Sequence, residues 1–344
     1  MARQTVIVIG ASAGGVYALK ELVASIPGDF DVPIFIVQHL AAAVRSYLPE
    51  ILSAAGPLKA IHPADNDPVA PGTIYIAPPD HHMLVEKDRI IVRKGPKENR
   101  FRPSIDALFR SAAYSYGPGA IGIVLTGLLN DGTSGMWSIK RLGGIGIIQE
   151  PEEALYPSMP TSVLEYVNVD FSVPISEMAG LLSRLVKEPV QDKPDLSSEE
   201  HTRMKREITI AAQENAFERG VMEMGPLTPL TCPECNGTLI TIREGKLIRY
   251  RCHTGHAFTS DALLAEVTKS VEENIWKSIR SLEETVMLLE QIGKNYEENG
   301  QPEEAEEFYN KARVTRERAR KLHDFVFQQE QYSEDLRSHK PEGA

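Results

Sequence analysis

The amino-acid sequence predicts an α/β fold, in which helices cover both faces of a doubly wound parallel sheet, followed by a small cysteine-containing module and an α-helical hairpin. Three observations support this prediction. Short runs rich in Val and Ile alternate with helical patterns up to about residue 187. All three cysteines lie between residues 232 and 252, and a seven-residue apolar repeat occupies the last part of the chain. With 344 residues, the chain is long enough for about two domains.

The first part of the chain is predicted to form the sheet and the helices that cover it. Runs of about five apolar residues bounded by Gly or Pro are typical of buried parallel strands, and periodic apolar residues between them are typical of helices. Residues 77–82 are predicted to form a hairpin turn. Strands are expected at 5–9, 33–37, 74–77, 90–92, 121–125 and 145–148, and helices at 16–26, 47–55, 105–116, 135–142 and 176–185.

Composition and charge exclude several classes of protein. The net charge of −11 argues against a chain that mainly neutralises phosphates, so nucleic acid is not an expected partner. The start of the chain lacks the pattern of a signal peptide. No apolar run reaches the ~18 residues of a membrane-spanning helix, so membrane insertion is not expected either. We therefore expect a soluble cytoplasmic protein.

The sequence changes character beyond residue 188, which predicts the domain boundaries. The sheet domain is expected at 1–188, and a polar linker with a helix at 189–228. The cysteine-containing module is expected at 229–262, an antiparallel helical hairpin at 263–332, and a disordered tail at 333–344. The apolar repeat of the hairpin, with a solvated face of charged residues around it, consists of Ile275, Ile279, Leu282, Val286, Leu289, Ala305, Phe308, Ala312, Thr315, Ala319, Leu322 and Val326.

Three polar residues, each just after an apolar run, suggest one hydrolytic site. Ser12, His39 and Asp131 follow the first, second and fifth of the predicted strands. Open parallel sheets bind ligands at the carboxyl ends of their strands, where we expect these residues to meet. A serine hydroxyl needs a base to take its proton, and the base needs an orienting group, so the three types predict a catalytic triad. His81 and His82 are rival bases.

Each member of the predicted triad also has a plain structural interpretation. Ser12 and Asp131 could each cap the helix that follows, and a lone histidine such as His39 is more often structural than catalytic. The Gly-rich turn at 10–15 could instead cradle a phosphate at a helix N-terminus. However, Ser12 occupies the place of the second glycine in the dinucleotide-binding fingerprint.

Residues near the triad are candidates for binding the oxyanion and the substrate. The backbone amides of Ala13 and of Leu128 or Leu129 could form an oxyanion hole. Arg102 could shape the substrate site. Ser104, which opens the helix at 105–116, has a plain interpretation as its cap.

The cysteines are spaced as metal ligands rather than as disulfides. Cys232 and Cys235 are separated by two residues, and Cys252 and His256 follow after a predicted hairpin at 238–250. Three thiolates and one imidazole suit tetrahedral Zn²⁺ and leave no open position, so we expect a structural zinc in a zinc-ribbon-like module. The alternative fourth ligand is the neighbouring His253, and the alternative to a metal is a set of buried reduced thiols.

Several motifs occur in order between residues 4 and 185: Gly10-Ala11-Ser12-Ala13-Gly14-Gly15, Gln38-His39, Ala77-Pro78-Pro79-Asp80-His81-His82, Arg102-Pro103-Ser104-Ile105-Asp106, Asn130-Asp131-Gly132, and Gln149-Glu150-Pro151-Glu152-Glu153-Ala154 with Met159-Pro160. In this order they resemble the chemotaxis protein-glutamate methylesterases, the CheB catalytic domain family. The resemblance implies a doubly wound parallel sheet and a triad at Ser12, His39 and Asp131. It also implies hydrolysis of glutamate γ-methyl esters on chemoreceptor helices without a catalytic cofactor. Some members of the family also deamidate receptor glutamines.

The sequence departs from the common pattern of this family in three places. Regulated members carry an N-terminal receiver domain, whereas here the resemblance begins at the start of the chain, which implies a stand-alone form. Ala13 stands where Thr is frequent, and Leu128-Leu129 stands where a Met-Gly pair is common. The C-terminal third resembles extensions of stand-alone or fused members. The expected partners are a methylated chemoreceptor helical domain, a receptor methyltransferase, and a second copy of the chain bound through the hairpin.

Three other functions compete with a hydrolase. The sheet domain could be a catalytically silent scaffold of a chemosensory complex, although an intact triad argues against this. A dinucleotide-dependent enzyme is the second alternative. The third is nucleic-acid binding by the cysteine-containing module, whose aromatic residues are Tyr250 and Phe258. The positive charge of that module comes from Arg243, Lys246, Arg249 and Arg251.

Overall fold

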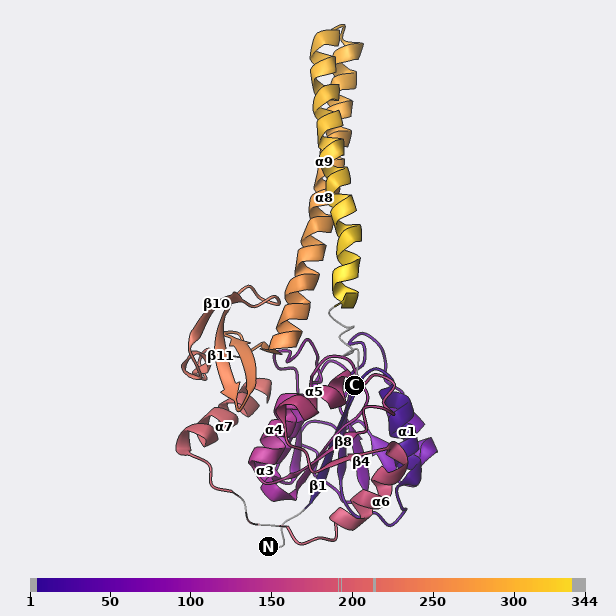
Figure 1. Cartoon of the computed structure of the whole chain (residues 1–344), viewed down its shortest axis with the longest axis vertical. Helices are drawn as coiled ribbons and strands as arrows, with labels where there is room; N and C mark the ends of the chain where they lie inside the picture. The colour runs from indigo at the N-terminus through magenta and orange to yellow at the C-terminus, as the bar shows by residue number, and fades with distance from the viewer. Residues whose placement is uncertain (1–4, 191, 193, 213–214, 336–344) are drawn as a thin grey trace, which may run out of the picture. The chain divides into compact units, whose positions relative to one another are not determined.

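The structure is a computed structural model that describes residues 5–190, 192, 194–212 and 215–335 (Figure 1). The chain divides into two compact units, Met1–Leu264 and Ala265–Ala344. The first unit contains a seven-stranded sheet and a four-stranded sheet, and the second unit is helical. Within the part of the chain that is described, none of the helices has the length and the apolar character needed to cross a membrane.

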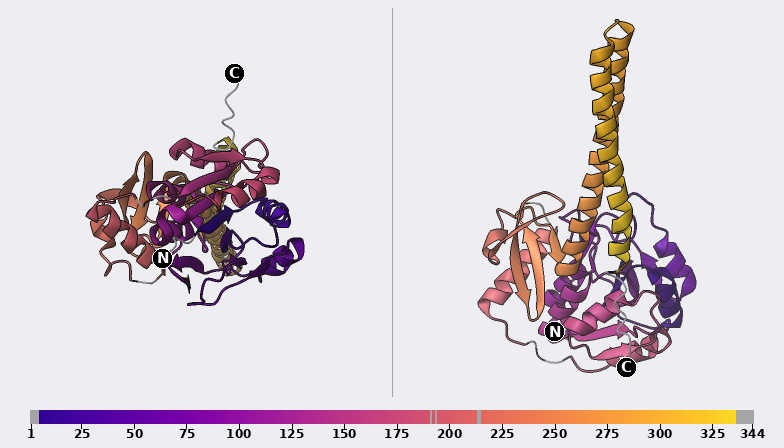
Figure 2. Two further views of the ribbon diagram at one scale, coloured as in Figure 1. Left: turned by 90° about the horizontal axis from the view of Figure 1, so that it is seen from below. Right: turned by 45° about the horizontal axis from the view of Figure 1, so that its top comes forward.

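The seven-stranded sheet is parallel throughout, in the order β3-β4-β2-β1-β7-β8-β9. Figure 2 gives two further views of the fold. β1 lies in the middle of the sheet and pairs with β2 on one side and with β7 on the other. The strands β2, β3 and β4 lie on one side of β1, and the later strands β7, β8 and β9 lie on the other side. The chain connections therefore diverge between β1 and β7. This topology confirms the predicted doubly wound α/β fold. The strands are β1 (Val6–Ala11), β2 (Ile34–Gln38), β3 (Lys59–Ile61), β4 (Thr73–Ile76), β7 (Ala120–Val124), β8 (Ile145–Gln149) and β9 (Phe171–Val173).

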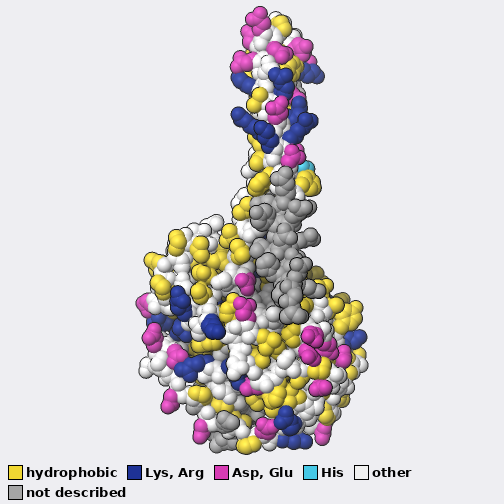
Figure 3. Space-filling model, in the orientation of Figure 1, with side chains coloured by type: hydrophobic (Ala, Val, Ile, Leu, Met, Phe, Trp, Pro, Cys, Tyr) yellow, Lys and Arg dark blue, Asp and Glu magenta, His cyan; other side chains and the backbone are white. Residues whose placement is uncertain are grey.

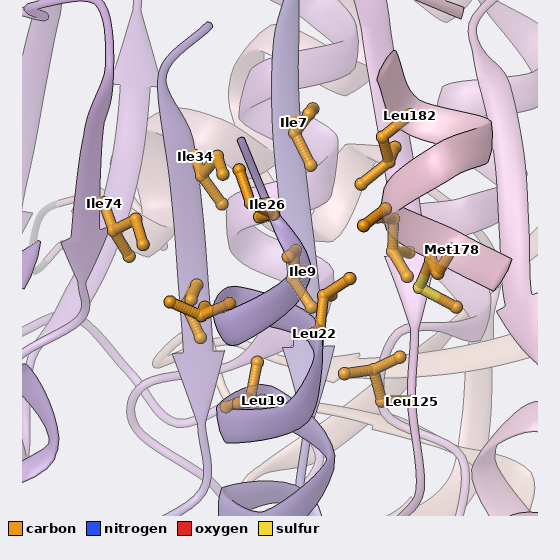
Figure 4. Packing of buried hydrophobic residues seen from close by; sticks show 14 of the residues in the cluster. Ile7, Ile9, Leu19, Leu22, Ile26, Ile34, Ile74, Leu125, Met178 and Leu182 are labelled. Carbon is orange, nitrogen blue, oxygen red and sulfur yellow. The ribbon is translucent and has the colours of Figure 1, made fainter. Parts of the chain in front are cut away.

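Alternating side chains of the strands feed two separate cores, because successive residues of a strand point to opposite faces. Ile7 and Ile9 belong to the core that also contains residues of α1 and α6, and Figure 4 shows Ile9 beside Leu22 of α1. Val8, from the same strand, belongs to the other core, which contains residues of α3, α4 and α5. The helices are α1 (Gly15–Ser25), α2 (Leu48–Ala55) and α6 (Ile175–Leu185) on the first face, and α3 (Ile105–Tyr116), α4 (Thr133–Arg141) and α5 (Ser158–Tyr166) on the second.

The predicted hairpin turn at 77–82 is wrong. His82 begins β5 (His82–Glu86), which pairs with β6 (Arg89–Arg93), so the turn of this hairpin lies at residues 87 and 88. The Pro78-Pro79 pair ends β4, which belongs to the parallel sheet. β3 and β9 were not predicted, because three residues are too few to show a period. α5 was also missed, since Pro160 resembles a helix breaker although it lies in the first turn, where proline is tolerated.

Residues 227–264, which we call the Cys-rich module, contain a four-stranded antiparallel sheet in the order β10-β11-β12-β13. The preceding helix, α7 (Ser198–Ala212), packs against α3 and the β5–β6 hairpin, with Met204 and Ala211 buried. This helix is therefore part of the first compact unit. The predicted domain boundaries at 188, 228 and 262 stay predictions. The remaining elements of the unit are β10 (Leu227–Thr231), β11 (Thr238–Glu244), β12 (Leu247–Cys252), β13 (Ala257–Thr259) and the 3₁₀ turns η1 (Gly117–Gly119) and η2 (Val221–Glu223).

Six buried charged side chains join the sheet domain, α7 and the Cys-rich module, and we call them the buried ionic cluster. Glu98 pairs with Arg110 of α3 at 3.2 Å and with Arg251 of β12 at 2.6 Å. Glu207 of α7 pairs with Arg249 of β12 at 2.5 Å. The arginines overcome the effect of burial and hold the pKa of Glu98 and of Glu207 well below the usual range. The members are Glu98, Arg110, Glu207, Glu244, Arg249 and Arg251.

The cluster corrects one expectation from the sequence. The sequence suggests Arg249 and Arg251 as positive charge for nucleic-acid binding, but their side chains are 2 % and 0 % exposed and are paired with glutamates. The alternation of residues along β12 does not show which face is buried. The sequence therefore cannot distinguish a buried arginine from a surface arginine.

Arg251→Ala is expected to lower the free energy of unfolding by about 3–5 kcal/mol, because Glu98 and Glu207 would keep their buried charges with one partner fewer. Arg184→Ala is the matched control, since Arg184 forms an exposed pair with Glu188 and should contribute less than about 1 kcal/mol. Equilibrium urea unfolding measures both values. Equal effects of the two substitutions would show that the buried cluster is not a major source of stability.

The second unit contains most of a helical hairpin made by α8 (Ser260–Glu298) and α9 (Pro302–Asp335). Tyr296 stacks on Phe308 near the connection, with ring centroids 5.4 Å apart. Figure 3 shows acidic and basic side chains interspersed on the surface of the hairpin, as expected for a solvated face. Of the predicted tail at 333–344, residues 336–344 lie outside the described residues. Gly293 of α8 is buried as well, although it is not part of the predicted repeat. Half of the predicted repeat positions are buried: Ile279, Val286, Ala305, Ala312, Ala319 and Val326.

Candidate active site

Ser12, His39 and Asp131 lie at the carboxyl ends of three neighbouring strands in the middle of the sheet. Ser12 directly follows β1, and His39 directly follows β2, which is hydrogen-bonded to β1. Asp131 lies on the loop after β7, on the other side of β1. The three residues therefore flank the place where the chain connections diverge, which is the usual ligand-binding place of an open α/β sheet.

A chain of hydrogen bonds joins the three side chains. His39 Nδ1 lies 3.2 Å from Ser12 Oγ, and His39 Nε2 lies 2.9 Å from Asp131 Oδ2. An ionised carboxylate only accepts, so Nε2 carries the ring proton and Nδ1 is left to accept from the serine hydroxyl. This is the tautomer that a general base requires. The side chains of His39 and Asp131 are 3 % and 1 % exposed, whereas Ser12 is half-buried.

Further contacts hold the His39 ring and the serine turn in place. Phe101 stacks on the imidazole, with the ring centroids 3.7 Å apart and the planes 11° from parallel. The Gln38 side-chain amide donates to the carbonyl oxygens of Ser12 and His39, at 2.8 and 3.0 Å. The Ser12 amide donates to the Thr126 carbonyl at 3.0 Å. The Phe101 ring thus holds the imidazole, and the Gln38 amide and the Thr126 carbonyl hold the backbone that carries Ser12 and His39.

The Asp131 carboxylate is oriented by donors from several parts of the chain. The Ile105 amide donates to Oδ2 at 2.7 Å and the Asp106 amide donates to Oδ1 at 3.2 Å, so Asp131 caps the N-terminus of α3. Burial raises its pKa, but the hydrogen bonds, first of all that from His39, hold the pKa of Asp131 below its usual value. The other donors are Asn99 Nδ2, Ser104 Oγ and the Gly132 amide, at 2.9, 3.0 and 3.1 Å.

A second buried carboxyl, that of Asp106, lies beside Asp131. Burial and then the negative charge of Asp131 raise the pKa of Asp106 well above its usual range. Its Oδ1 accepts from the amides of Gly132 and Gly135 at 3.0 and 2.6 Å, and its Oδ2 accepts from Asn99 at 2.7 Å. The opposite shifts of the two carboxyls favour a single negative charge on Asp131, which faces His39.

The plain structural interpretations of Ser12, Asp131 and Ser104 as helix caps need correction. Gly14 is the N-cap residue of α1, so the Ser12 side chain does not cap that helix. Asp131 does cap a helix, but this helix is α3, which precedes it, and not α4, whose N-cap residue is Gly132. Ser104 occupies the N-cap position of α3, yet its hydroxyl donates to Asp131 and makes no cap hydrogen bond.

The rival histidines hydrogen-bond to the backbone. His82 is fully buried, donates through Nε2 to the Pro96 carbonyl at 2.8 Å, and accepts at Nδ1 from the Ser104 amide. Burial also lowers the pKa of His82. His81 Nδ1 lies 3.0 Å from the Pro79 carbonyl. Among the described residues, His39 is the histidine whose ring accepts a hydrogen bond from the Ser12 hydroxyl.

The glycines of the serine turn are explained by close packing. A Cβ at Gly10 would lie 2.3 Å from the Ile105 side chain, and a Cβ at Gly15 would lie 2.2 Å from Gln38 Oε1. Gly127 faces the serine, because a Cβ there would lie 2.8 Å from Ser12 Cβ. Internal packing therefore accounts for these glycines without a bound phosphate, which weakens the interpretation as a dinucleotide site.

The predicted oxyanion donors lie on the two loops that flank Ser12. Among the described residues, the amides of Ala13 and Leu128 have no hydrogen-bond partner, whereas the Gly127 amide donates to the Tyr156 carbonyl. Leu129, the alternative to Leu128, has a positive φ of 63°, which marks a sharp turn at this loop. The oxyanion role of these amides stays a prediction.

Arg102 is engaged within the fold. Its Nε donates to Asp80 Oδ1 at 2.9 Å, and its Nη1 donates to the Gly95 carbonyl at 2.6 Å. These contacts give Arg102 a structural role. Its role in substrate binding stays a prediction.

The four predicted metal ligands lie together in the Cys-rich module. The ligand atoms of Cys232, Cys235, Cys252 and His256 all lie within 4.8 Å of one another. Cys235 Sγ is 3.6 Å from Cys252 Sγ, and His256 Nδ1 is 3.6 Å from Cys252 Sγ. A tetrahedral zinc ion with Zn–S of about 2.3 Å requires edges of roughly 3.6–3.8 Å. The donor set and its spacing therefore fit such an ion. His253 is outside this group and packs against Gly237.

Sequence reasoning missed the contacts that three residues make with the triad. Asn99, Phe101 and Ser104 hold Asp131 or His39, and all lie just before or at the start of α3. Only Ser104 belonged to a recognised motif. Positive φ values of 48° at Asn99 and 77° at Arg100 mark a tight turn, but a sequence cannot show what such a turn faces.

Comparisons with known proteins agree with this geometry. The sequence model of the CheB methylesterase family matches residues 7–182. A protein of Leptospira interrogans, provisionally named protein-glutamate methylesterase/protein-glutamine glutaminase, is 38% identical over 180 residues, which cover 52% of this chain and 93% of that protein. The protein-glutamate methylesterase/protein-glutamine glutaminase 2 of Methanosarcina mazei is 34% identical over 192 residues, which cover 54% of this chain and 52% of that protein.

A solved structure is similar as well. The crystal structure of the Thermotoga maritima CheB methylesterase catalytic domain matches with a TM-score of 0.52 and 31% identity, covering 53% of this chain and 98% of that one. The match therefore leaves 47% of this chain without a counterpart in that structure. Through its sheet domain, this chain belongs to the CheB methylesterase family.

Proposed function

We propose that the chain is a serine hydrolase that removes methyl esters from glutamate side chains of chemoreceptors. The observation that carries the proposal is the hydrogen-bonded series Ser12 Oγ, His39 Nδ1, His39 Nε2 and Asp131 Oδ2 at the carboxyl ends of β1, β2 and β7. The names of the relatives supply the class of substrate. Their names also include glutaminase activity, which the same residues could perform on an amide.

The proposed reaction has two steps. His39 Nδ1 takes the hydroxyl proton while Ser12 Oγ attacks the ester carbonyl carbon, and the amides of Ala13 and Leu128 stabilise the oxyanion. The bond to the methoxy oxygen then breaks, and this oxygen receives the proton from Nδ1, so methanol leaves and an acyl-enzyme remains. Water attacks the acyl carbon in the same way and releases the free glutamate. With a glutamine substrate, ammonia would leave in place of methanol.

Asp131 has two proposed roles in this reaction. It holds His39 in the tautomer with the proton on Nε2, and its charge stabilises the imidazolium that forms when Nδ1 takes the serine proton. The low pKa of Asp131, caused by its hydrogen bonds in spite of burial, keeps it ionised at neutral pH.

The surface near the serine suits a protein substrate. Leu155 and Tyr156 follow β8 and are 66% and 39% exposed, and Leu128 follows β7 and is 40% exposed. Leu155 lies close to the serine turn, since a Cβ at Gly14 would be 3.1 Å from it. Exposed apolar side chains beside a catalytic hydroxyl are suited to bury apolar side chains of a substrate helix. We propose that these residues contact the receptor.

We also propose that Cys232, Cys235, Cys252 and His256 hold a structural Zn²⁺ ion. Four protein ligands would fill its coordination shell, so the metal would stabilise the Cys-rich module and take no part in ester hydrolysis. The α8–α9 hairpin is proposed to pair with another helix, with a receptor, a methyltransferase or a second copy of the chain as its candidate partners.

Methanol release tests the proposed function. The full chain is incubated with cytoplasmic receptor domains that carry glutamate methyl esters, and with the same domains lacking the esters as control. We expect methanol in proportion to the esters present. A chain that reacts with a fluorophosphonate at Ser12 but releases no methanol would be a hydrolase of another ester, and a chain that does neither would be the silent scaffold.

A further inference from the structure

The turn before α3 connects the triad to the Cys-rich module. Glu98 and Phe101 exchange backbone hydrogen bonds of 3.2 and 2.9 Å, which close a tight turn with Asn99 and Arg100 at its tip. One end of this turn carries Phe101, which stacks on His39. The other end is held by Glu98, which belongs to the buried ionic cluster and pairs with Arg251 of the module. The ion pair between Glu98 and Arg251 thus ties one end of the turn to the module.

Asn99 contacts the triad and the module at the same time. Its side-chain nitrogen donates to Asp131 Oδ1 at 2.9 Å, and its side-chain oxygen accepts from the Thr259 amide at 2.9 Å. Its own backbone amide donates to the Ala257 carbonyl at 2.8 Å. The side chain is buried, and both ends of the amide are bonded, so its orientation is set by β13. A donor to Asp131 is therefore held in place by a strand of the Cys-rich module.

Thr259 makes a second connection, through the residue next to Asp131. Its hydroxyl donates to Asn130 Oδ1 at 2.6 Å and accepts from the Ala262 amide at 3.3 Å. The side-chain nitrogen of Asn130 donates to Asp261 of the module at 2.8 Å. Asn130 and Thr259 are both buried. The loop after β7 is therefore held on both sides of the Asn130 amide by residues of the module.

We propose that the Cys-rich module is a positioning element of the active site: β13, through Asn99 and Thr259, holds the Asp131 carboxylate in line with His39. This inference rests on the proposed hydrolase function and adds a role for the C-terminal extension. Asn99 and Thr259 touch no substrate, so they are positioning residues. A displacement of the order of 1 Å in a catalytic group can lower a rate by about 100-fold, which sets the scale of the expected effect.

The hydroxyl of Thr259 is tested with a pair of variants. Thr259→Val removes the hydrogen bond to Asn130 at nearly constant volume, and we expect the rate at which a fluorophosphonate labels Ser12 to fall about 10-fold or more. Thr259→Ser keeps the hydroxyl and is expected to restore most of the rate. With methylated receptor as substrate, the loss should appear in kcat and leave KM nearly unchanged. Equal rates for the valine and serine variants would overturn the role of this hydroxyl.

The amide of Asn99 is tested by Asn99→Gly, which keeps the left-handed backbone at this position and removes the side chain. We expect labelling of Ser12 to slow by about 10- to 100-fold, and the downfield proton resonance of the His39–Asp131 hydrogen bond to shift. Asn66→Gly is the matched control, because Asn66 is also in the left-handed region, at φ 67°, but is exposed and hydrogen-bonds to Asp65 and Ile90. Its labelling rate should equal that of the unchanged chain.

The readouts separate a positioning role from loss of folding and from a wrong substrate. Thermal unfolding of each variant shows whether the first unit remains folded at the assay temperature. The fluorophosphonate needs an activated serine but no receptor, so a wrong substrate would leave the contrast between the Val and Ser variants intact. Folded Asn99→Gly and Thr259→Val chains that label Ser12 at the unchanged rate, with the His39 proton unshifted, would overturn the proposal.

Discussion

Ser12→Ala is expected to lower the rate of methanol release by at least ~10⁴-fold, since it removes the only atom proposed to attack the ester carbon. The substitution leaves the fold intact, because the Ser12 side chain caps no helix and its hydroxyl bonds to His39. The measurement compares initial rates of methanol release and the trapping of an acyl-enzyme on denaturation. Ser25→Ala is the matched control, because Ser25 is an exposed serine at the end of α1 and should leave the rate unchanged.

The other members of the triad sharpen this prediction. Catalytic groups that act as a unit have non-additive effects on the rate. The variant with both Ser12→Ala and His39→Ala should therefore release methanol no more slowly than Ser12→Ala alone. Asp131→Asn should also cost a large part of the rate, because an amide in place of the carboxylate favours the wrong tautomer of His39. A Ser12→Ala chain that keeps more than a few per cent of the methanol release would place the nucleophile elsewhere.

Removal of the proposed zinc ion from the Cys-rich module is expected to unfold that module. Structural zinc sites of this ligand type contribute about 10–16 kcal/mol of apparent binding energy, far more than a small four-stranded sheet can supply by its own packing. We expect close to one zinc per chain in protein purified without added metal. On treatment with a strong chelator, the thiols of Cys232 and Cys252, which are buried, should become reactive and the melting temperature should fall.

Two histidine variants test which histidine is the fourth ligand of the proposed zinc ion. His256→Ala should lose the zinc and expose the thiols without any chelator, because Nδ1 of His256 lies among the three sulfur atoms. His253→Ala should keep the zinc, because His253 lies outside this group. A zinc content near zero that chelators do not change, with the module still folded, would show that the cysteines are simply buried thiols.

The fold class and the strand ends could be predicted from the sequence because their signals are local. A run such as residues 33–37 is recognisable without its neighbours, and a polar residue at its end, His39, is marked by that run alone. The heptad positions of the hairpin could be predicted for the same reason, as the burial of Ile279 and Ala312 shows. Short elements such as β3 could not, because three residues do not complete a pattern.

The signals that failed were those whose meaning depends on a distant partner. Asp131 looked like a cap of the helix after it, but it caps α3, which begins 26 positions earlier in the chain. Arg251 looked like surface charge, but it lies buried against Glu98, 153 positions away. Asn99 carried no signal at all, since an asparagine in a charged loop is ordinary until β13 is placed beside it.

The amino-acid sequence by itself determined that this chain forms a doubly wound sheet, that a serine, a histidine and an aspartate follow its strands, and that four possible metal ligands lie close together in the chain. These features depend on periodicity and spacing, which neighbouring residues impose. Only the tertiary structure decided that β13 supports the carboxylate beside His39, because hydrogen bonds between segments more than 120 positions apart arise from packing and leave no periodic trace.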